Sequence, residues 1–182
     1  MQSYVTLISL KGANFAGMNI KPLNILLADD DVDDCIFFDK ALKALPLATI
    51  LTTVHDGEQL MNYLADHAEN LPDVLFLDLS MPRKTGFECL SEIKESNKLK
   101  YLPVVMCSTS YPKDMIYEQD MINMLIKIGA HIYIRKPGGF EQLKKVIHEA
   151  LITIAEKAAD NIAGEMHMQY IPTDKNILKA IK

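Results

Sequence analysis

The chain has 182 residues, of which 49% are apolar and 24% are charged, a balance that is usual for folded proteins and excludes wholesale disorder. The length suits one ordinary domain with tails. The formal net charge of −5 excludes a general attraction to nucleic acid, and no apolar run approaches the roughly 18 residues of a membrane-spanning helix, so we expect neither nucleic acid nor a membrane as a partner.

Strand-like and helix-like segments alternate through most of the chain. Apolar runs rich in β-branched residues indicate strands, and apolar residues at helical spacing indicate helices. In chain order we predict strand Leu23–Asp29, helix Val32–Leu45, strand Ala48–Val54, helix Glu58–His67, strand Asp73–Asp78, helix Gly86 to about Ser96, strand Pro103–Cys107, helix Lys113–Ile128, strand His131–Ile134 and helix Phe140 to about Ala158. This alternation, with short connections and near-continuous apolar strands, predicts an α/β fold: a doubly wound five-stranded parallel sheet with helices on both faces.

The segments at the two ends do not fit this pattern. We assign the domain to residues 21–158, after an N-terminal extension (1–20) that is either not native or poorly ordered, and before a C-terminal tail (159–182). The first residues lack the basic start of a secretory signal, which predicts a cytoplasmic protein. The three cysteines have no short pairing motif, so we expect reduced and mostly buried thiols at Cys35, Cys89 and Cys107.

Polar side chains follow four of the predicted strands at the point where each strand ends. They are Asp29 and Asp30 after the first strand, Asp78 at the end of the third, Ser108 after the fourth, and Lys136 after the fifth. Because ligands of open parallel sheets bind outside the carboxyl ends of the strands, we expect these groups to surround one small pocket. Three clustered carboxylates repel one another and need a cation or shifted pKa values, and oxygen ligands of this kind suit Mg²⁺.

Four segments carry a resemblance to a known family, the receiver domain of two-component response regulators. They are Asn24–Asp31, Val74–Pro82, Pro103–Ser110 and Ala130–Pro137. The resemblance covers roughly residues 22–153 and implies a flavodoxin-like fold of the receiver type. No output domain is visible in the sequence, so the chain resembles the stand-alone, single-domain members of the family.

The resemblance also implies roles for individual residues. Asp78 matches the aspartate that a histidine kinase or phosphotransfer protein phosphorylates. Asp29 and Asp30 match the acidic pair that holds Mg²⁺ together with Asp78 and the backbone carbonyl of Ser80. The remaining matches are Lys136 to the invariant lysine, Ser108 to the switch hydroxyl, and Tyr133 to the aromatic residue whose rotation accompanies switching.

Two departures from the family pattern stand out. Asp33 and Asp34 extend the acidic run, and we expect them to be first-turn residues favoured by the helix dipole and not metal ligands. The second departure is a longer span between Ser108 and Lys136, which adds length around the fourth predicted helix. On that helix we expect Ile122, Leu125 and Ile126 to face the core. A second apolar strip would then either bind a partner or be covered by a loop or the tail; it consists of Tyr117, Met121, Met124 and Ile128.

The leading functional prediction is a receiver in a phosphorelay, phosphorylated on Asp78, that signals by binding a downstream protein. It can also form a homodimer through the face made by the fourth helix, the fifth strand and the last helix. It is not an enzyme, although it accepts a phosphoryl group on itself and can lose it slowly. The alternative is a receiver-like binding module that works without phosphorylation. A nucleophilic-aspartate phosphohydrolase ranks lower, because Ser80 stands where its second catalytic acid would be.

Overall fold

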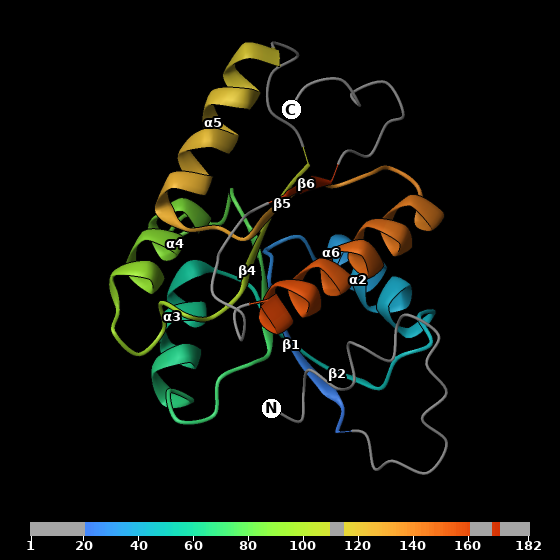
Figure 1. Cartoon of the computed structure of the whole chain (residues 1–182), viewed down its shortest axis with the longest axis horizontal. Helices are drawn as coiled ribbons and strands as arrows, with labels where there is room; N and C mark the ends of the chain where they lie inside the picture. The colour runs from blue at the N-terminus through green and yellow to red at the C-terminus, as the bar shows by residue number, and fades with distance from the viewer. Residues whose placement is uncertain (1–20, 110–114, 161–168, 172–182) are drawn as a thin grey trace.

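The computed structural model describes residues 21–109, 115–160 and 169–171 (Figure 1). All ten predicted strands and helices are present within these ranges, with ends that differ by a few residues. The elements in chain order are β1 (Leu23–Ala28), α2 (Val32–Lys43), β2 (Thr49–Val54), α3 (Gly57–Asp66), β3 (Val74–Asp78), α4 (Gly86–Glu95), β4 (Val104–Ser108), α5 (Met115–Ile128), β5 (Ile132–Arg135), α6 (Phe140–Asp160) and β6 (Gln169–Ile171).

The strands form one sheet in the order β2-β1-β3-β4-β5-β6, and every neighbouring pair is parallel. The first five strands confirm the predicted doubly wound arrangement, in which the order reverses between β1 and β3. The sixth strand was not predicted. It pairs with β5, with Tyr133 opposite Tyr170, and comes from the segment that we had assigned to the tail.

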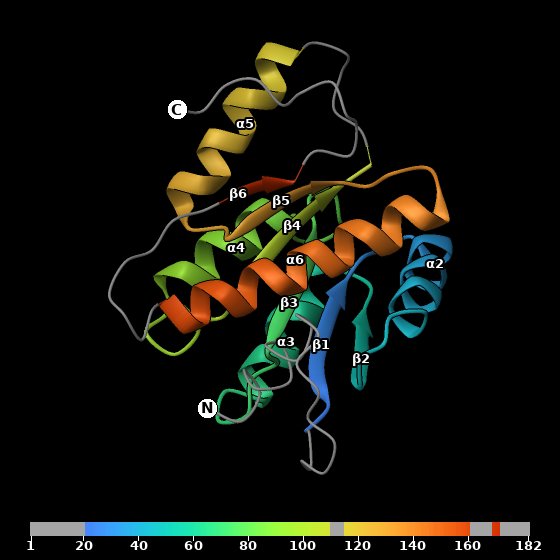
Figure 2. The ribbon, with the colours of Figure 1, turned by 45° about the vertical axis from the view of Figure 1, so that its right-hand side comes forward.

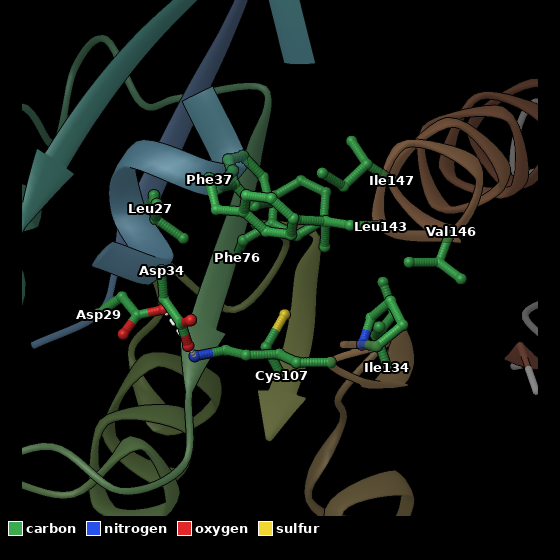
Figure 3. Close-up of a pocket in the computed structure, with 13 residues that line it drawn as sticks. Leu27, Asp29, Asp34, Phe37, Phe76, Cys107, Ile134, Leu143, Val146 and Ile147 are labelled. Carbon is green, nitrogen blue, oxygen red and sulfur yellow. Dashed lines mark hydrogen bonds and ion pairs between the residues drawn. The ribbon is translucent and has the colours of Figure 1, made fainter. Parts of the chain in front are cut away.

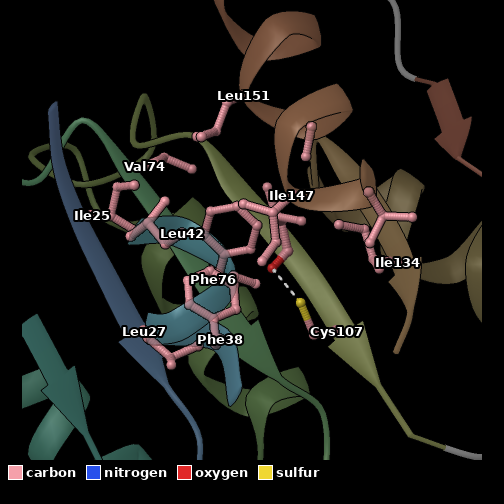
Figure 4. Packing of buried hydrophobic residues seen from close by; sticks show 14 of the residues in the cluster. Ile25, Leu27, Phe38, Leu42, Val74, Phe76, Cys107, Ile134, Ile147 and Leu151 are labelled. Atoms are coloured by element: carbon pink, nitrogen blue, oxygen red, sulfur yellow. Dashed lines mark hydrogen bonds between the residues drawn. The ribbon is translucent and has the colours of Figure 1, made fainter. Parts of the chain in front are cut away.

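Helices cover both faces of the sheet (Figures 1 and 2). On one face α2 and α6 lie together, and on the other lie α3, α4 and α5. In the first layer the rings of Phe38 and Phe76 pack edge to face with centroids 4.9 Å apart, beside Leu42 and Ile147 (Figure 4). Each large apolar side chain buried in this way contributes about 1.5–3 kcal/mol relative to an exposed position, so the two layers hold the sheet in place.

Capping residues at the helix starts fix where the chain turns after each strand. The Asp31 side chain accepts hydrogen bonds from the backbone of Asp33 and Asp34 at the start of α2, and Asp56 accepts one from Gln59 at the start of α3. Thr85 begins α4 with a reciprocal capping box. These three helices therefore begin at the carboxyl edge of the sheet, with the positive ends of their dipoles at that edge.

The residues predicted for the second apolar strip of α5 differ in exposure, and one residue predicted for its core face is on the surface. Ile122 and Leu125 are buried, as expected, but Ile126 is 41% exposed because it lies one helical step, about 100°, from Leu125. Met121 and Ile128 are partly buried against the core, whereas Met124 is 53% exposed. The Tyr117 side chain lies outside the described residues, so the described members of the strip divide between the core boundary and the surface.

Two simpler predictions concern the cysteines and the membrane. All three cysteines are free and buried, as expected. Within the described residues, no helix combines the length and the apolar character that crossing a membrane requires.

Candidate functional site

The polar groups predicted to share a pocket do lie at one edge of the sheet. Asp29 follows β1, Asp78 ends β3 and Ser108 ends β4, and all three are buried, with exposed fractions of 3%, 6% and 5%. Lys136 follows β5, and its backbone N–H donates to the Ser108 carbonyl oxygen at 2.7 Å. Parallel pairing of β1, β3, β4 and β5 brings these ends together, because their carboxyl termini share one edge.

Lys136 is the centre of the site. Its Nζ atom lies 2.8 Å from Asp78 Oδ1, 2.7 Å from Asp29 Oδ2 and 2.9 Å from Asp34 Oδ2. Asp34 is in the first turn of α2, as predicted, but its contact with Lys136 was not predicted. The signal that could have found it is its place one turn after the strand end that carries Asp29, on a helix that starts at the same edge.

The charges in this cluster do not balance. Burial opposes the charge on Lys136, but hydrogen bonds from its ammonium to Asp29 and Asp78 raise the pKa of Lys136 above its usual range. Burial raises the pKa of Asp29, and the hydrogen bond from Lys136 opposes that change. Three carboxylates surround one ammonium, which leaves a formal excess of two negative charges. Such an excess favours binding of a further cation.

Backbone amides orient the carboxylates. The Ser80 N–H donates to Asp78 Oδ2 at 2.7 Å, and the Asp31 N–H donates to Asp29 Oδ1 at 3.2 Å. Each of these two carboxylates therefore uses one oxygen for Lys136 and the other for the chain that follows its own strand. The Asp78 side chain is consequently held on both sides.

The predicted metal ligands are only partly brought together. Asp29 and Asp78 share Lys136, whereas Asp30 is exposed. Among residues 21–109, 115–160 and 169–171, no group of three or more carboxylate, imidazole or thiol side chains is arranged so that it could hold a metal ion directly. The three carboxylates at this site are arranged around the Lys136 ammonium. The oxygen donors and the excess negative charge nevertheless fit a hard divalent cation, since Mg²⁺ binds through one or two carboxylates and keeps several waters.

The two predicted switch residues lie on adjacent strands. Ser108 is the last residue of β4 and is paired in register with Arg135 of β5. Tyr133 is 1% exposed, and its hydroxyl donates to Glu118 Oε1 on α5 at 3.3 Å. The ring therefore lies inward, against the layer formed by α3, α4 and α5.

A small pocket of about 30 Å³ lies behind the charged cluster, between α2, α6 and the sheet. Figure 3 shows Asp29 and Asp34 together at one side of it, with Phe37 and Phe76 nearby and Ile147 on the α6 side. A volume of this size holds about one water molecule. The apolar walls keep bulk solvent from this side of Asp29, which is the burial that raises the pKa of this carboxyl group.

A parallel α/β sheet with aspartates, a hydroxyl and a lysine at its carboxyl edge defines a class of phosphoryl-accepting signalling domain. The pattern of the response regulator receiver domain matches residues 25–148, and the chain belongs to this family. The match includes each of the four strand ends described above.

Individual relatives support the assignment over most of their length. The chain is 30% identical over 131 residues to the probable methanogenesis regulatory protein FilR2 of Methanothrix harundinacea (strain 6Ac), covering 70% of this chain and 81% of that protein. It is 29% identical over 130 residues to the response regulator Rcp1 of Synechocystis sp. (strain ATCC 27184 / PCC 6803 / Kazusa), covering 69% and 84%.

Solved structures show the same fold. The phosphorylated cyanobacterial phytochrome response regulator RcpA is 32% identical with a TM-score of 0.61, covering 71% of this chain and 91% of that one. The Mn²⁺-bound form of Rcp1 is 28% identical with a TM-score of 0.60, covering 70% of this chain and 91% of that one. The chain is thus similar to one receiver solved in a phosphorylated state and to another solved with a divalent metal.

Proposed function

We propose that this receiver domain accepts a phosphoryl group on Asp78 from a histidine kinase or a phosphotransfer protein. The observation that carries the proposal is the position of the Asp78 carboxylate, 2.8 Å from Lys136 Nζ at the carboxyl end of β3. Asp29 and Asp34 share the same ammonium, but neither ends a strand in the centre of the sheet as Asp78 does. The output is a change in protein–protein binding.

The transfer needs little chemistry from the protein beyond position and charge. A carboxylate oxygen of Asp78 attacks the phosphorus of a phosphohistidine, the new O–P bond forms, and the P–N bond breaks as the imidazole takes a proton from solvent. Lys136 offers an ammonium to one equatorial oxygen, and the Ser108 hydroxyl can donate to another. The Ser80 N–H, 2.7 Å from Asp78 Oδ2, holds the nucleophile in orientation.

When bound, a divalent cation, Mg²⁺ in this proposal, would neutralise part of the charge of the phosphoryl group. Asp29 and Asp78 would hold it, with the Ser80 carbonyl and with Asp30 after a modest rearrangement or through water. Binding requires Lys136 to share Asp29 and Asp78 with the cation. Asp34, one-third exposed and 2.9 Å from Lys136 Nζ, can keep the ammonium in the site as it does so.

Phosphorylation places a group with close to two negative charges and three strong acceptors on Asp78, next to Lys136, where the carboxylate alone carried one charge. The Ser108 hydroxyl is then drawn toward the new group, which moves the chain after β4. The Tyr133 ring can move into the space that this leaves, and the hydrogen bond to Glu118 links that movement to α5. The surface we propose for the partner is α5, where Met124 and Ile126 are exposed.

Receiver domains are generally not enzymes, and they interact with kinases, phosphotransfer proteins and downstream proteins. We propose the same for this chain, with Asp78 modified once per signal and not turning over a substrate. A homodimer through α5, β5 and α6 would have to form beside β6, because β6 already occupies the outer edge of β5.

The test is phosphorylation of the purified full chain by acetyl phosphate with Mg²⁺, followed by intact mass and peptide mapping. Wild type should gain one phosphoryl group that hydroxylamine removes, as an acyl phosphate requires. Asp78→Asn should gain none. Asp33→Asn is the matched control, because it removes an exposed carboxylate from the first turn of α2 and should be modified like wild type. Modification that persists in Asp78→Asn would move the acceptor elsewhere.

A further inference from the structure

The loop between β3 and α4 closes on itself directly after Asp78. The Gly86 N–H donates to the Leu79 carbonyl oxygen at 3.1 Å, and the Lys84 N–H donates to the Pro82 carbonyl oxygen at 2.7 Å. The second bond spans a single residue, Arg83, whose φ is +64°. This second bond closes a γ-turn whose central residue has a positive φ, a strained turn for a residue with a Cβ atom.

Arg83 is the only non-glycine residue with a positive φ in the described parts of the chain, and its side chain has an unusual partner. The guanidinium binds the carboxylate of Asp56, which is fully buried, while Arg83 itself is half-exposed. The other Asp56 oxygen accepts the Gln59 N–H at 2.8 Å as the cap of α3. Arg83 Nε also lies 4.0 Å from Glu58 Oε2, so the first turn of α3 supplies both acids.

A buried carboxylate is costly unless it is paired and hydrogen-bonded. The Asp56 carboxylate has both a cap hydrogen bond and the Arg83 ion pair, so loss of the guanidinium would leave its charge buried with only the cap. The cost of leaving the Asp56 charge unpaired favours the position of Arg83 in which its guanidinium binds that carboxylate. The ion pair therefore offsets the strain of the turn at Arg83.

The loop also packs tightly against its neighbours. A Cβ atom added at Gly57 would overlap the Lys84 carbonyl oxygen, and one added at Gly86 would overlap the Asp78 carbonyl oxygen. The backbone of the turn is therefore pressed between the start of α3 and the end of β3. A shift of Arg83 cannot stay local, because the chain on both sides of it is in contact.

We propose that Arg83 is a positioning residue for the phosphoacceptor site and acts through its ion pair with Asp56. The loop between β3 and α4, which the Arg83 turn belongs to, carries Ser80, whose N–H orients Asp78 and whose carbonyl would be a cation ligand. Arg83 contacts neither Asp78 nor the phosphoryl group. The inference rests on the proposed function for its consequence, but the anchoring of the loop can be tested without it.

The experiment compares Arg83→Ala, Arg83→Lys, Asp56→Asn and the double variant Arg83→Ala/Asp56→Asn in the full chain. Ala keeps a Cβ atom and thus a similar backbone preference at φ +64°, so the substitution removes the guanidinium and its aliphatic stem without adding a glycine's freedom. Asn keeps the capping oxygen on α3, and it replaces the charged oxygen that binds Arg83 with a neutral amide group. Lys84→Ala is the matched control: it removes the neighbouring cation of the same loop, which binds Glu92 instead.

The first readout is the affinity for Mn²⁺ alone, and the second is the amide resonance of Ser80 in metal-free protein. Arg83→Ala and Asp56→Asn should each weaken Mn²⁺ binding about tenfold, with little further loss in the double variant. Arg83→Lys should stay within about threefold of wild type. Simple loss of a nearby positive charge would strengthen cation binding, so the direction of the change in Arg83→Ala separates positioning from bulk electrostatics. In Asp56→Asn both effects weaken binding, so for that variant the Ser80 resonance and the double variant carry the distinction.

The Ser80 amide resonance should shift in Arg83→Ala and in Asp56→Asn but not in Lys84→Ala. Equal behaviour of Arg83→Ala and Lys84→Ala in both readouts would overturn the inference, as would lowered thermal stability with the Ser80 resonance and the Mn²⁺ affinity unchanged. If wild type binds no Mn²⁺ and accepts no phosphate, the proposed function fails, and the Ser80 resonance still decides whether Arg83 holds the loop.

Discussion

The hydroxyl of Tyr133 on β5 donates to Glu118 Oε1 on α5 at 3.3 Å, and the Glu118 carboxylate also lies 3.6 Å from Arg135 Nη1 on the same strand. Glu118 is therefore shared between two side chains of β5. One of them is the predicted switch aromatic, which is buried, and the other is half-exposed. The contact gives a direct route from a change in Tyr133 to the position of α5, the element with the exposed Met124 and Ile126.

Replacing Tyr133 with Phe keeps the buried ring and removes the hydroxyl that donates this hydrogen bond. We expect the free energy of unfolding of the unphosphorylated protein to fall by about 0.5–1.5 kcal/mol, the usual net value of one such bond. Urea unfolding measures it. Tyr101→Phe is the control, because Tyr101 is 78% exposed and should change stability little. Equal stability of wild type and Tyr133→Phe would show that the hydroxyl does not tie β5 to α5.

Gly86 allows the loop after Asp78 to approach β3. Gly86→Ala should lower the free energy of unfolding by about 2–3 kcal/mol, because a Cβ atom would overlap the Asp78 carbonyl oxygen, a backbone atom that cannot move away alone. It should also slow phosphorylation of Asp78.

Gly138→Ala provides the matched control for that substitution. No atom lies within 4 Å of a Cβ added at Gly138, so the variant should be as stable as wild type or up to about 1 kcal/mol more stable through the unfolded state. Chemical denaturation measures the free energy of unfolding of Gly86→Ala and Gly138→Ala. Similar stabilities for the two would mean that the loop can shift without cost.

The sequence predicted the strands β1 to β5 and all five helices of the described residues, because their apolar runs are long and their periods are clear. It did not predict β6, which has three residues and gains its place only by pairing with β5. Such a strand carries no periodic signal of its own. The orientation of α5 was partly wrong for a related reason: with apolar residues around most of the helix, the pattern does not say whether Ile126 or Met121 turns toward the sheet.

The main groups of the site were predictable because each one ends or follows a strand. Asp78, Asp29, Ser108 and Lys136 all lie where the alternation of elements places them. For the contact between Asp34 and Lys136 the sequence offers only one signal, the place of Asp34 one turn after the strand end that carries Asp29, because the contact itself depends on how α2 packs over the edge of the sheet. The pair between Arg83 and Asp56 joins two loops 27 residues apart, and nothing in the sequence distinguishes it from solvated surface charges.

The buried Asp29 carboxylate should lower the free energy of unfolding in the absence of metal. Burial raises the pKa of Asp29 in the folded protein above its value in the unfolded chain, so protonation of Asp29 favours folding. This stabilisation grows as the pH falls through the range between the two pKa values, and it is absent at neutral pH. Asp29→Asn removes the buried charge and should raise the free energy of unfolding by about 1 kcal/mol at neutral pH in metal-free buffer.

Mg²⁺ should then distinguish the two proteins. It should stabilise wild type in proportion to its occupancy and Asp29→Asn much less. Asp33→Asn, an equal change of charge at an exposed position nearby, should leave both the stability and the response to Mg²⁺ close to those of wild type. A less stable Asp29→Asn protein in metal-free buffer would contradict the prediction.

His131 should make the fold sensitive to mild acid from the opposite edge of the sheet. Its Nδ1 atom accepts the Val104 N–H at 3.3 Å, and burial, helped by Lys94 and Lys157, lowers its pKa to about 4. Because the folded value lies below the unfolded value near 6.5, the unfolded chain takes up the proton first. The contribution of neutral His131 to the free energy of unfolding is therefore fully present above about pH 6.5 and is lost as the pH falls below that value.

We expect titration of His131 to remove about 2 kcal/mol between about pH 7.5 and pH 5, measured by urea unfolding as the difference between wild type and a variant that does not titrate at this position. His131→Asn is the matched variant, because the Asn oxygen can accept the Val104 N–H but does not titrate. Its stability should vary less over the same range, and the difference between the two curves should appear below about pH 6.5. Parallel curves would show that His131 is protonated as easily in the folded protein as in the unfolded chain. The Asp29 contribution has the opposite sign and is common to both proteins, so it cancels in the comparison.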